Sequence, residues 1–186
     1  MEEETIDKEE AANLIKTLSE RIALLHISYA KTLIEELGEE YGKRLILRSI
    51  KAYGRYIGEA RRKEVEEKGL EPTAENFSEG GSLSIPPFGM HSGIEREGGK
   101  MKAYGCAMGK FWRELGEEEL GKLYCYVDAA KYLGYNEDLV QVHTKAMTAG
   151  DDHCEFEIKE STEEQKELFE ADEKDFSKVD EYLCDD

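Results

Sequence analysis

The spacing of apolar residues changes along this chain of 186 residues, and the change constrains the fold more than any other feature. In the first third, apolar side chains return every three or four positions, as on one face of an α-helix. Later, from about residue 138 to 159, they alternate with polar side chains, as in a strand with one buried face. Helices followed by alternating strands are typical of an α+β fold.

Two long helices are predicted in the N-terminal half. The first ends at Gly38, and the second runs from about Glu39 to Gly69. Their apolar faces consist of Leu14, Leu18, Ile22, Leu25, Tyr29 and Leu33, and of Leu45, Ile46, Ile50, Tyr53 and Ile57. Gly54 and Gly58 lie one turn apart. Because glycine inside a helix costs up to about 1 kcal/mol against alanine, we expect another backbone to approach closely there.

Two antiparallel hairpins are predicted, within residues 94–106 and 138–159. Gly98 and Gly99 suit the turn of the first, and its second strand is expected to end at Cys106. The segment between the hairpins reads as helical, with a break at Gly116 and a C-terminal cap at Gly134. The predicted architecture is therefore a helical N-terminal half packed on an antiparallel sheet, with a helix inserted between two hairpins.

In the second hairpin, two alternating sets of residues are expected to face opposite sides. The expected inward set is Val140, Val142, Thr144 and Ala146 with Cys154, Phe156 and Ile158, and the polar set of the first strand is Gln141, His143 and Lys145. The segment 70–93 has no periodicity, and it is predicted to be a ligand-binding loop or a disordered one.

Residues 1–160 are predicted to form a single α+β domain, and residues 161–186 an acidic C-terminal extension. Twelve acids and three lysines between Glu160 and Asp186 provide half of the net charge of −18. Ser161 and Glu164 have the spacing of a capping box, which predicts a short helix holding Leu168 and Phe169 against the domain. Beyond about residue 172 we expect weak packing.

The charge and the cysteine pattern exclude several classes of function. A net charge of −18 repels phosphate backbones and anionic lipids, so neither nucleic acid nor membrane is expected as a partner. The acidic start and the absence of a long apolar run predict a soluble, cytoplasmic protein without a secretory signal. The four cysteines form no C-x-x-C pair, which argues against a zinc ribbon, a thioredoxin motif and disulfides, and Cys184 reads as incidental.

Four residues form the candidate site: Cys106, Cys125, Asp128 and Cys154. Cys125 and Asp128 are three apart, so on one helix they would share a face. Thiolates serve as metal ligands and nucleophiles, and a carboxylate serves as ligand or base. The alternative is that the cysteines are packed as small apolar side chains. A buried, unpaired carboxylate is costly, which favours a site that includes Asp128.

Several residues of this region resemble a known family. The sequence has a cysteine at a strand end (Cys106), "LG" before a helix, "C-x-x-D" on that helix (Cys125 and Asp128), and "GDDHCEF" at 150–156. This pattern resembles the L-2-amino-thiazoline-4-carboxylic acid hydrolase family. The chain has His143 where arginine is expected and Glu155 where aspartate is common.

The resemblance implies a small-molecule hydrolase that opens a cyclic C–N (amidine-like) bond, as in hydrolysis of 2-amino-thiazoline-4-carboxylate to N-carbamoyl-L-cysteine. Asp128 would be the base or a metal ligand, and the three cysteines would hold zinc or iron, attack directly, or only pack, with no cofactor as an equal alternative. The implied partner is a carboxylate-bearing heterocycle, and the oligomeric state is left open. Expected substrate-binding residues are His143, Asp151, His91 and Tyr124, and candidates to hold the carboxylate are Arg48, Arg55, Arg61 and Lys145.

A second, weaker resemblance is to small-molecule-binding domains related to vinyl reductases, carried by "G-x-x-x-C-x-F" at 150–156. It implies a ligand sensor or carrier without catalysis. The two functions are distinguished by the cavity, because a hydrolase needs ionisable groups in its lining and a sensor needs only a pocket.

Overall fold

The computed structural model describes residues 6–81, 83–97 and 100–170, with backbone alone for residues 168–170. Its elements follow the order α1 (Lys8–Leu37), α2 (Glu39–Glu67), η1 (Glu75–Glu79), α3 (Pro87–Met90), β1 (Gly93–Glu97), β2 (Lys100–Tyr104), α4 (Ala107–Leu115), α5 (Glu118–Cys125), α6 (Val127–Tyr135), β3 (Leu139–Lys145), η2 (Met147–Ala149), β4 (His153–Glu160) and α7 (Glu163–Glu170). No helix of the described ranges is long and apolar enough to cross a membrane.

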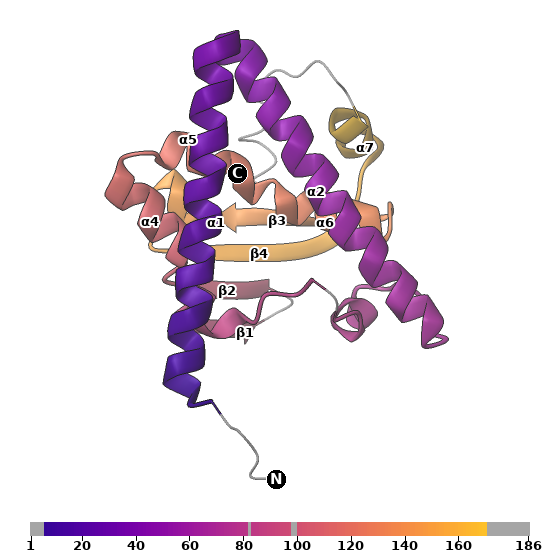
Figure 1. Cartoon of the computed structure of the whole chain (residues 1–186). Coiled ribbons are helices and arrows are strands. Elements are labelled where there is room, and N and C mark those ends of the chain that lie inside the picture. The colour runs from indigo at the N-terminus through magenta and orange to yellow at the C-terminus, as the bar shows by residue number, and fades with distance from the viewer. Residues whose placement is uncertain (1–5, 82, 98–99, 171–186) are drawn as a thin grey trace.

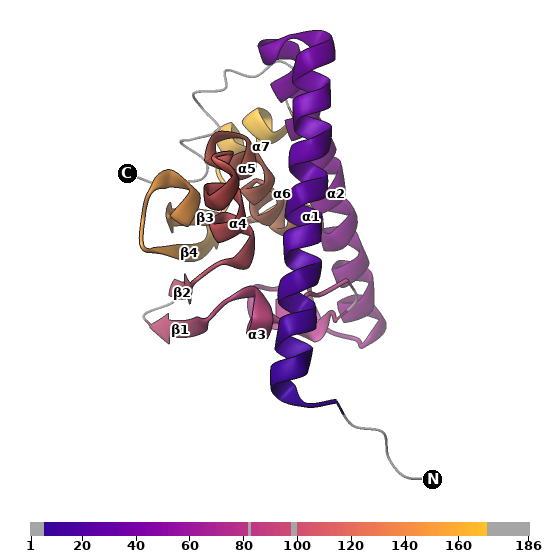
Figure 2. The ribbon, with the colours of Figure 1, turned by 60° about the vertical axis from the view of Figure 1, so that its left-hand side comes forward.

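The fold is α+β, as the sequence predicts. The four strands form one antiparallel sheet in the order β1-β2-β4-β3, so the two hairpins are joined through β2 and β4. The long helices α1 and α2 both pass in front of this sheet (Figure 1). Figure 2 shows the strands on one side of the molecule and α1 with α2 on the other, with α4, α5 and α6 between them.

The face that α1 buries differs from its large apolar stripe. Leu14, Leu25 and Tyr29 are more than half exposed, whereas the buried positions are Ser19, Ala23, His26, Ile27 and Ala30. Small side chains there let neighbouring helices approach, and the carbonyl of Ala23 accepts a hydrogen bond from the indole of Trp112 at 3.2 Å. The predicted helix is confirmed, but the tertiary contacts decide which of its faces is covered.

Helices α2 and α6 pack backbone to backbone at the predicted glycines. A methyl group on Gly54 would lie 2.4 Å from Cβ of Ala130, and one on Gly58 would lie 2.1 Å from the carbonyl oxygen of Lys131. The expectation of a close approach is confirmed. Gly134, expected to end a helix, instead packs on the α2 backbone, and α6 continues to Tyr135.

The helical segment between the hairpins contains three helices, one more than predicted. The break at Gly116 is present, and a second break at Tyr126 separates α5 from α6. β2 ends at Tyr104, two residues before the expected end, and Cys106 caps α4 by accepting a hydrogen bond from the amide of Gly109.

Strand β3 is buried on both faces, which corrects the assignment of His143 to a polar, outward face. Val140 and Val142 pack into a cluster with α2, α5 and α6. Gln141 and His143 are only 5% and 2% exposed, and they share the opposite face with Phe156, the cross-strand partner of His143. Alternation in the sequence cannot detect this, because neighbouring elements cover both sides of the strand.

The short helix of the C-terminal segment starts one residue later than predicted. Its capping box is formed by Thr162 and Gln165, each of which accepts a hydrogen bond from the backbone amide of the other. The hydroxyl of Ser161 instead donates to the carbonyl of Glu137. The side chains of Leu168 and Phe169 and the residues beyond 170 lie outside the described part.

Candidate functional site

A chamber of about 290 Å³ lies between the inner face of the sheet, the helices α2 and α4 to α6, and the segment 83–91. Part of the segment 70–93, predicted to be a ligand-binding loop or a disordered one, therefore forms one of its walls. Seven of the residues singled out in the sequence line this chamber: His91, Cys106, Tyr124, Cys125, Asp128, His143 and Cys154. They come from six different segments, and only the tertiary fold brings them together.

Asp128 lies in the first turn of α6, where the N-terminal end of the helix favours a negative charge. Its Oδ1 accepts a hydrogen bond from Nζ of Lys131 at 2.7 Å, and its Oδ2 lies 3.7 Å from Nε2 of His143. Burial would raise the pKa of Asp128, but the charges of Lys131 and His143 and the lysine hydrogen bond outweigh it, and the pKa is lowered. Asp128 is therefore an anion at neutral pH.

Two imidazoles line the chamber together with this carboxylate. Burial lowers the pKa of His143 and of His91 below the ordinary value, against the opposing charge of Asp128. His143 also packs on the ring of Phe156, with centroids 4.5 Å apart. Nδ1 of His91 is buried and has no hydrogen-bond partner in the described part of the chain. Both rings are therefore neutral near pH 7, and a neutral imidazole can accept a proton.

The three thiols form the sulfur-rich part of the lining. Burial raises the pKa of Cys106, raises that of Cys125 well above the ordinary value, and raises that of Cys154 to about 12. The sulfur of Cys154 accepts a hydrogen bond from the amide of Met147 at 3.4 Å, and that of Cys125 lies 3.9 Å from the hydroxyl of Thr148. These groups are thiols, not thiolates, at neutral pH.

No three His, Cys, Asp or Glu side chains of the described ranges are grouped so as to hold a metal ion. The cysteines lie around one chamber without forming such a group. Tyr124, the remaining predicted lining residue, packs its ring against Tyr53, His26 and Trp112. Burial raises the pKa of Tyr124, so it is a neutral hydroxyl there.

Several singled-out residues lie elsewhere. Asp151 does not line the chamber, and its Oδ2 accepts a hydrogen bond from the amide of Ala146, which shapes the turn before β4. Nδ1 of His153 contacts Asp152, and Nε2 of His26 contacts the carbonyl of Leu120. Of the four basic residues proposed to hold a carboxylate, Arg61 lines the chamber, and Arg48, Arg55 and Lys145 do not.

Lys131, Arg96 and Trp112 also line the chamber and were missed by the sequence reasoning. Lys131 could have been found, because a lysine three positions after Asp128 on a helix lies within ion-pair reach. Arg96 carries no such signal, because its position depends on how β1 pairs with the rest of the sheet.

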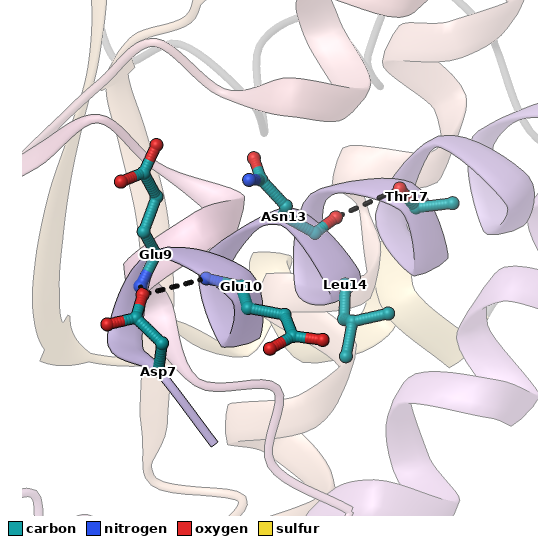
Figure 3. A pocket seen from close by; sticks show the side chains of 6 residues that line it. All are labelled: Asp7, Glu9, Glu10, Asn13, Leu14 and Thr17. Carbon is teal, nitrogen blue, oxygen red and sulfur yellow. Dashed lines mark hydrogen bonds between the residues drawn. The ribbon is translucent and has the colours of Figure 1, made fainter.

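A second hollow, at the start of α1, is lined by Asp7, Glu9, Glu10, Asn13, Leu14 and Thr17. Figure 3 shows its polar contacts: Oδ1 of Asp7 accepts hydrogen bonds from the amides of Glu9 and Glu10, and Thr17 donates to the carbonyl of Asn13. All six residues lie on the exposed surface of one helix end. The contacts are those of a helix cap, and we assign no chemistry to this hollow.

Comparison with known proteins gives one match. The model of a family described as L-2-amino-thiazoline-4-carboxylic acid hydrolase matches residues 16–158, which is more than half of the chain. The match extends from α1 to β4 and so includes every element that lines the chamber. Neither the search of curated proteins nor the search of solved structures found a match.

Proposed function

Because the chain belongs to the L-2-amino-thiazoline-4-carboxylic acid hydrolase family, we propose that it is a hydrolase that adds water to the C=N carbon of a cyclic amidine bearing a carboxylate. The observation that carries this proposal is the ionised Asp128 beside the neutral imidazole of His143, at 3.7 Å, in a chamber that His91 also lines. A general base and an orienting carboxylate are what activation of water requires.

In the proposed reaction, His143 takes a proton from the attacking water. Asp128 lies at ion-pair distance from His143, so it orients the ring and stabilises the imidazolium that forms. The lowered pKa of Asp128 makes it a weak base, and we therefore assign it this positioning role in place of the base role expected from the sequence. His91, with its unpartnered Nδ1, is placed to contact the heterocycle.

Atom balance fixes the bond that breaks. For 2-amino-thiazoline-4-carboxylate, oxygen from water adds to the carbon between nitrogen and sulfur, and the ring sulfur leaves as a thiol to give N-carbamoyl-L-cysteine. The two protons of the water end on the ring nitrogen and on the sulfur, and the imidazolium of His143 returns the one that it took. The C–S bond breaks in this substrate, and the corresponding C–N bond breaks when nitrogen replaces that sulfur. The un-ionised thiols of the lining suit a polarisable sulfur ring, and this route needs no thiolate.

The test is incubation of the purified protein with 2-amino-thiazoline-4-carboxylate in ¹⁸O-water, with the product followed by mass spectrometry. We expect one ¹⁸O atom in the carbamoyl group. His143→Gln should lower kcat by about a hundredfold or more, which is the usual contribution of a general base. His153→Gln is the matched control, because this imidazole does not line the chamber.

The proposal would be contradicted if the wild-type protein formed no labelled product from any of the cyclic amidines tested. The alternative, a ligand sensor without catalysis, is not favoured by the cavity. Its lining holds Asp128, Lys131 and two histidines, whereas a sensor of apolar ligands needs no ionisable group there.

A further inference from the structure

A second, larger chamber adjoins the inner one. This outer chamber measures about 660 Å³ and reaches the residues around η1 and the end of β4. The two chambers share nine residues, among them the three cations Arg61, Arg96 and Lys131. Positive charge is therefore concentrated at their junction.

Arg61 is held firmly at this junction. Its guanidinium donates one hydrogen bond to the carbonyl of Phe77 at 3.2 Å and another to the hydroxyl of Ser84, and it lies 4.4 Å from the centre of the Phe77 ring. Its Nε is buried without a hydrogen-bond partner in the described ranges. No carboxylate of the described residues lies within ion-pair distance of Arg61.

Arg96 reaches the same junction from the sheet. It pairs with Met101 on β2, Met101 pairs with Phe156 on β4, and Phe156 pairs with His143 on β3. These four residues form one row across the face that lines the chamber. Three strand spacings separate Arg96 from His143 along the row, which is about 14 Å. This is a distance between strand backbones, and the long side chain of Arg96 covers part of it, so a guanidinium at the junction can hold a ligand whose ring lies near His143.

The guanidinium of Arg96 makes no ion pair or hydrogen bond with the part of the chain that the structure describes. Arg96 is exposed on the edge strand β1, so it borders the junction from the solvent side. The nearby cations Lys131 and Lys100 are already paired, with Asp128 and Glu155. Among the described residues neither Arg61 nor Arg96 forms an ion pair with a carboxylate, although the charge of Glu64 acts on Arg61 from a greater distance, and an anionic ligand would supply a direct partner.

We infer that Arg61 and Arg96 form an anion-binding subsite at the junction of the two chambers, where they hold the carboxylate of a heterocyclic acid whose ring occupies the inner chamber. The choice of a heterocyclic acid rests on the proposed function, and the subsite itself rests on the geometry. Guanidinium groups bind carboxylates and phosphates alike through paired hydrogen bonds, so the choice of a carboxylate comes from the proposed function. The outer chamber leaves room for a substituent beyond the carboxylate.

The test uses thiazole-4-carboxylate and its neutral amide, thiazole-4-carboxamide, neither of which has the amidine group that the proposed reaction needs. Trp112 is the single tryptophan of the chain and lines the inner chamber, so its fluorescence reports occupancy, with calorimetry as a second measurement. We expect the acid to bind more tightly than the amide. Arg96→Gln should weaken binding of the acid by about tenfold or more and leave binding of the amide unchanged.

The matched control is Arg62→Gln, which changes the charge by the same amount on α2 but removes a surface pair with Glu66 outside both chambers. Arg61→Lys separates charge from geometry, and it should keep the fold while losing part of the preference for the acid.

Equal binding of acid and amide by the wild type, or normal binding of the acid by Arg96→Gln, would overturn the inference. Because neither probe needs to be hydrolysed, a protein that binds the acid through these arginines but opens no ring would keep the subsite and lose the proposed reaction. If the protein opens rings but Arg96→Gln and Arg61→Lys bind the acid as the wild type does, the proposed reaction stands and the subsite is lost.

Discussion

Asp128 is the residue on which the electrostatics of the inner chamber depend. Lys131 holds one of its oxygens, His143 faces the other, and its charge also acts on His91. The C-x-x-D spacing pointed to this residue, but the ion pair with Lys131 changes its chemistry from base to fixed anion. The role of a carboxylate depends on its partners, and those come from the fold.

Asp128→Asn should lower kcat and also move the acid limb of the pH–rate profile to lower pH. The reason is that the charge of Asp128 raises the pKa of both histidines, so its removal lets burial depress them further. A pH–rate profile of kcat for the wild type and the variant measures this. An unchanged limb would show that neither histidine titrates in the reaction.

The chamber thiols should be unreactive in the native protein. Their pKa values are raised by burial, so little thiolate is present at pH 8. In a Cys184→Ser background, we expect slow reaction of Cys106, Cys125 and Cys154 with a disulfide reagent, and rapid reaction of all three in urea. Fast stoichiometric labelling of one native thiol would instead favour a cysteine nucleophile.

At the scale of elements, the contact between α2 and α6 determines where Asp128 and Lys131 lie. Gly54 and Gly58 remove the side chains that would separate the two backbones. The sequence predicted this contact from two glycines one turn apart. It did not predict the partner helix, because nothing in the spacing of Gly54 and Gly58 specifies which backbone approaches.

Gly58→Ala should destabilise the protein by about 1–3 kcal/mol, the usual cost of forcing atoms into a packed interface. The added methyl group would lie 2.1 Å from the carbonyl oxygen of Lys131, so α6 must shift and activity should fall as well. Urea denaturation measures the change. Gly81→Ala, with nothing within 4 Å of the added methyl group, is the control and should stay within about 0.5 kcal/mol.

At the scale of the whole molecule, three buried histidines link stability to pH. Burial lowers the pKa of His26, His91 and His143 relative to the unfolded chain. Well above pH 6.5 all three histidines are neutral in the folded and in the unfolded protein, so they do not change the free energy of unfolding with pH. Below it, the unfolded chain binds protons that the folded protein does not, so stability falls until the pH passes the folded pKa values.

The free energy of unfolding should therefore decrease between pH 7 and pH 5, and His143→Asn should decrease less steeply than wild type. Relief of repulsion among the acidic groups acts in the opposite direction in both proteins, so the difference in slope isolates the histidine. Urea titrations across this range provide the measurement. Parallel slopes would mean that His143 titrates alike in the folded and unfolded states.

The acidic C-terminal segment is predicted to contribute little to this stability. Deletion of residues 173–186 should leave Tm nearly unchanged, because the twelve acids after residue 159 favour solvation over packing. A large drop in Tm would show that Phe176, Val179, Tyr182 and Leu183 form a packed element. Thermal unfolding of the full and shortened chains decides between the two.

The sequence by itself determined the main elements and the family. Backbone geometry imposes periods of 3.6 and 2, so the two long helices, the two hairpins and the α+β class follow from apolar spacing. The residues that carry the family resemblance, Cys106, Cys125, Asp128 and Cys154, also lie close enough in the chain for their order and spacing to be recognised.

Only the tertiary structure decided which faces are covered and which distant residues meet. The apolar stripe of α1 is largely exposed and the polar residues of β3 are buried, because burial depends on neighbours that the local spacing does not specify. Arg61, Arg96 and Asp128 come from α2, β1 and α6, and they line one chamber because strand pairing and the contact between α2 and α6 bring them there. Contacts between residues so far apart in sequence have no local signature, since they are made by side chains that meet only after the chain has folded.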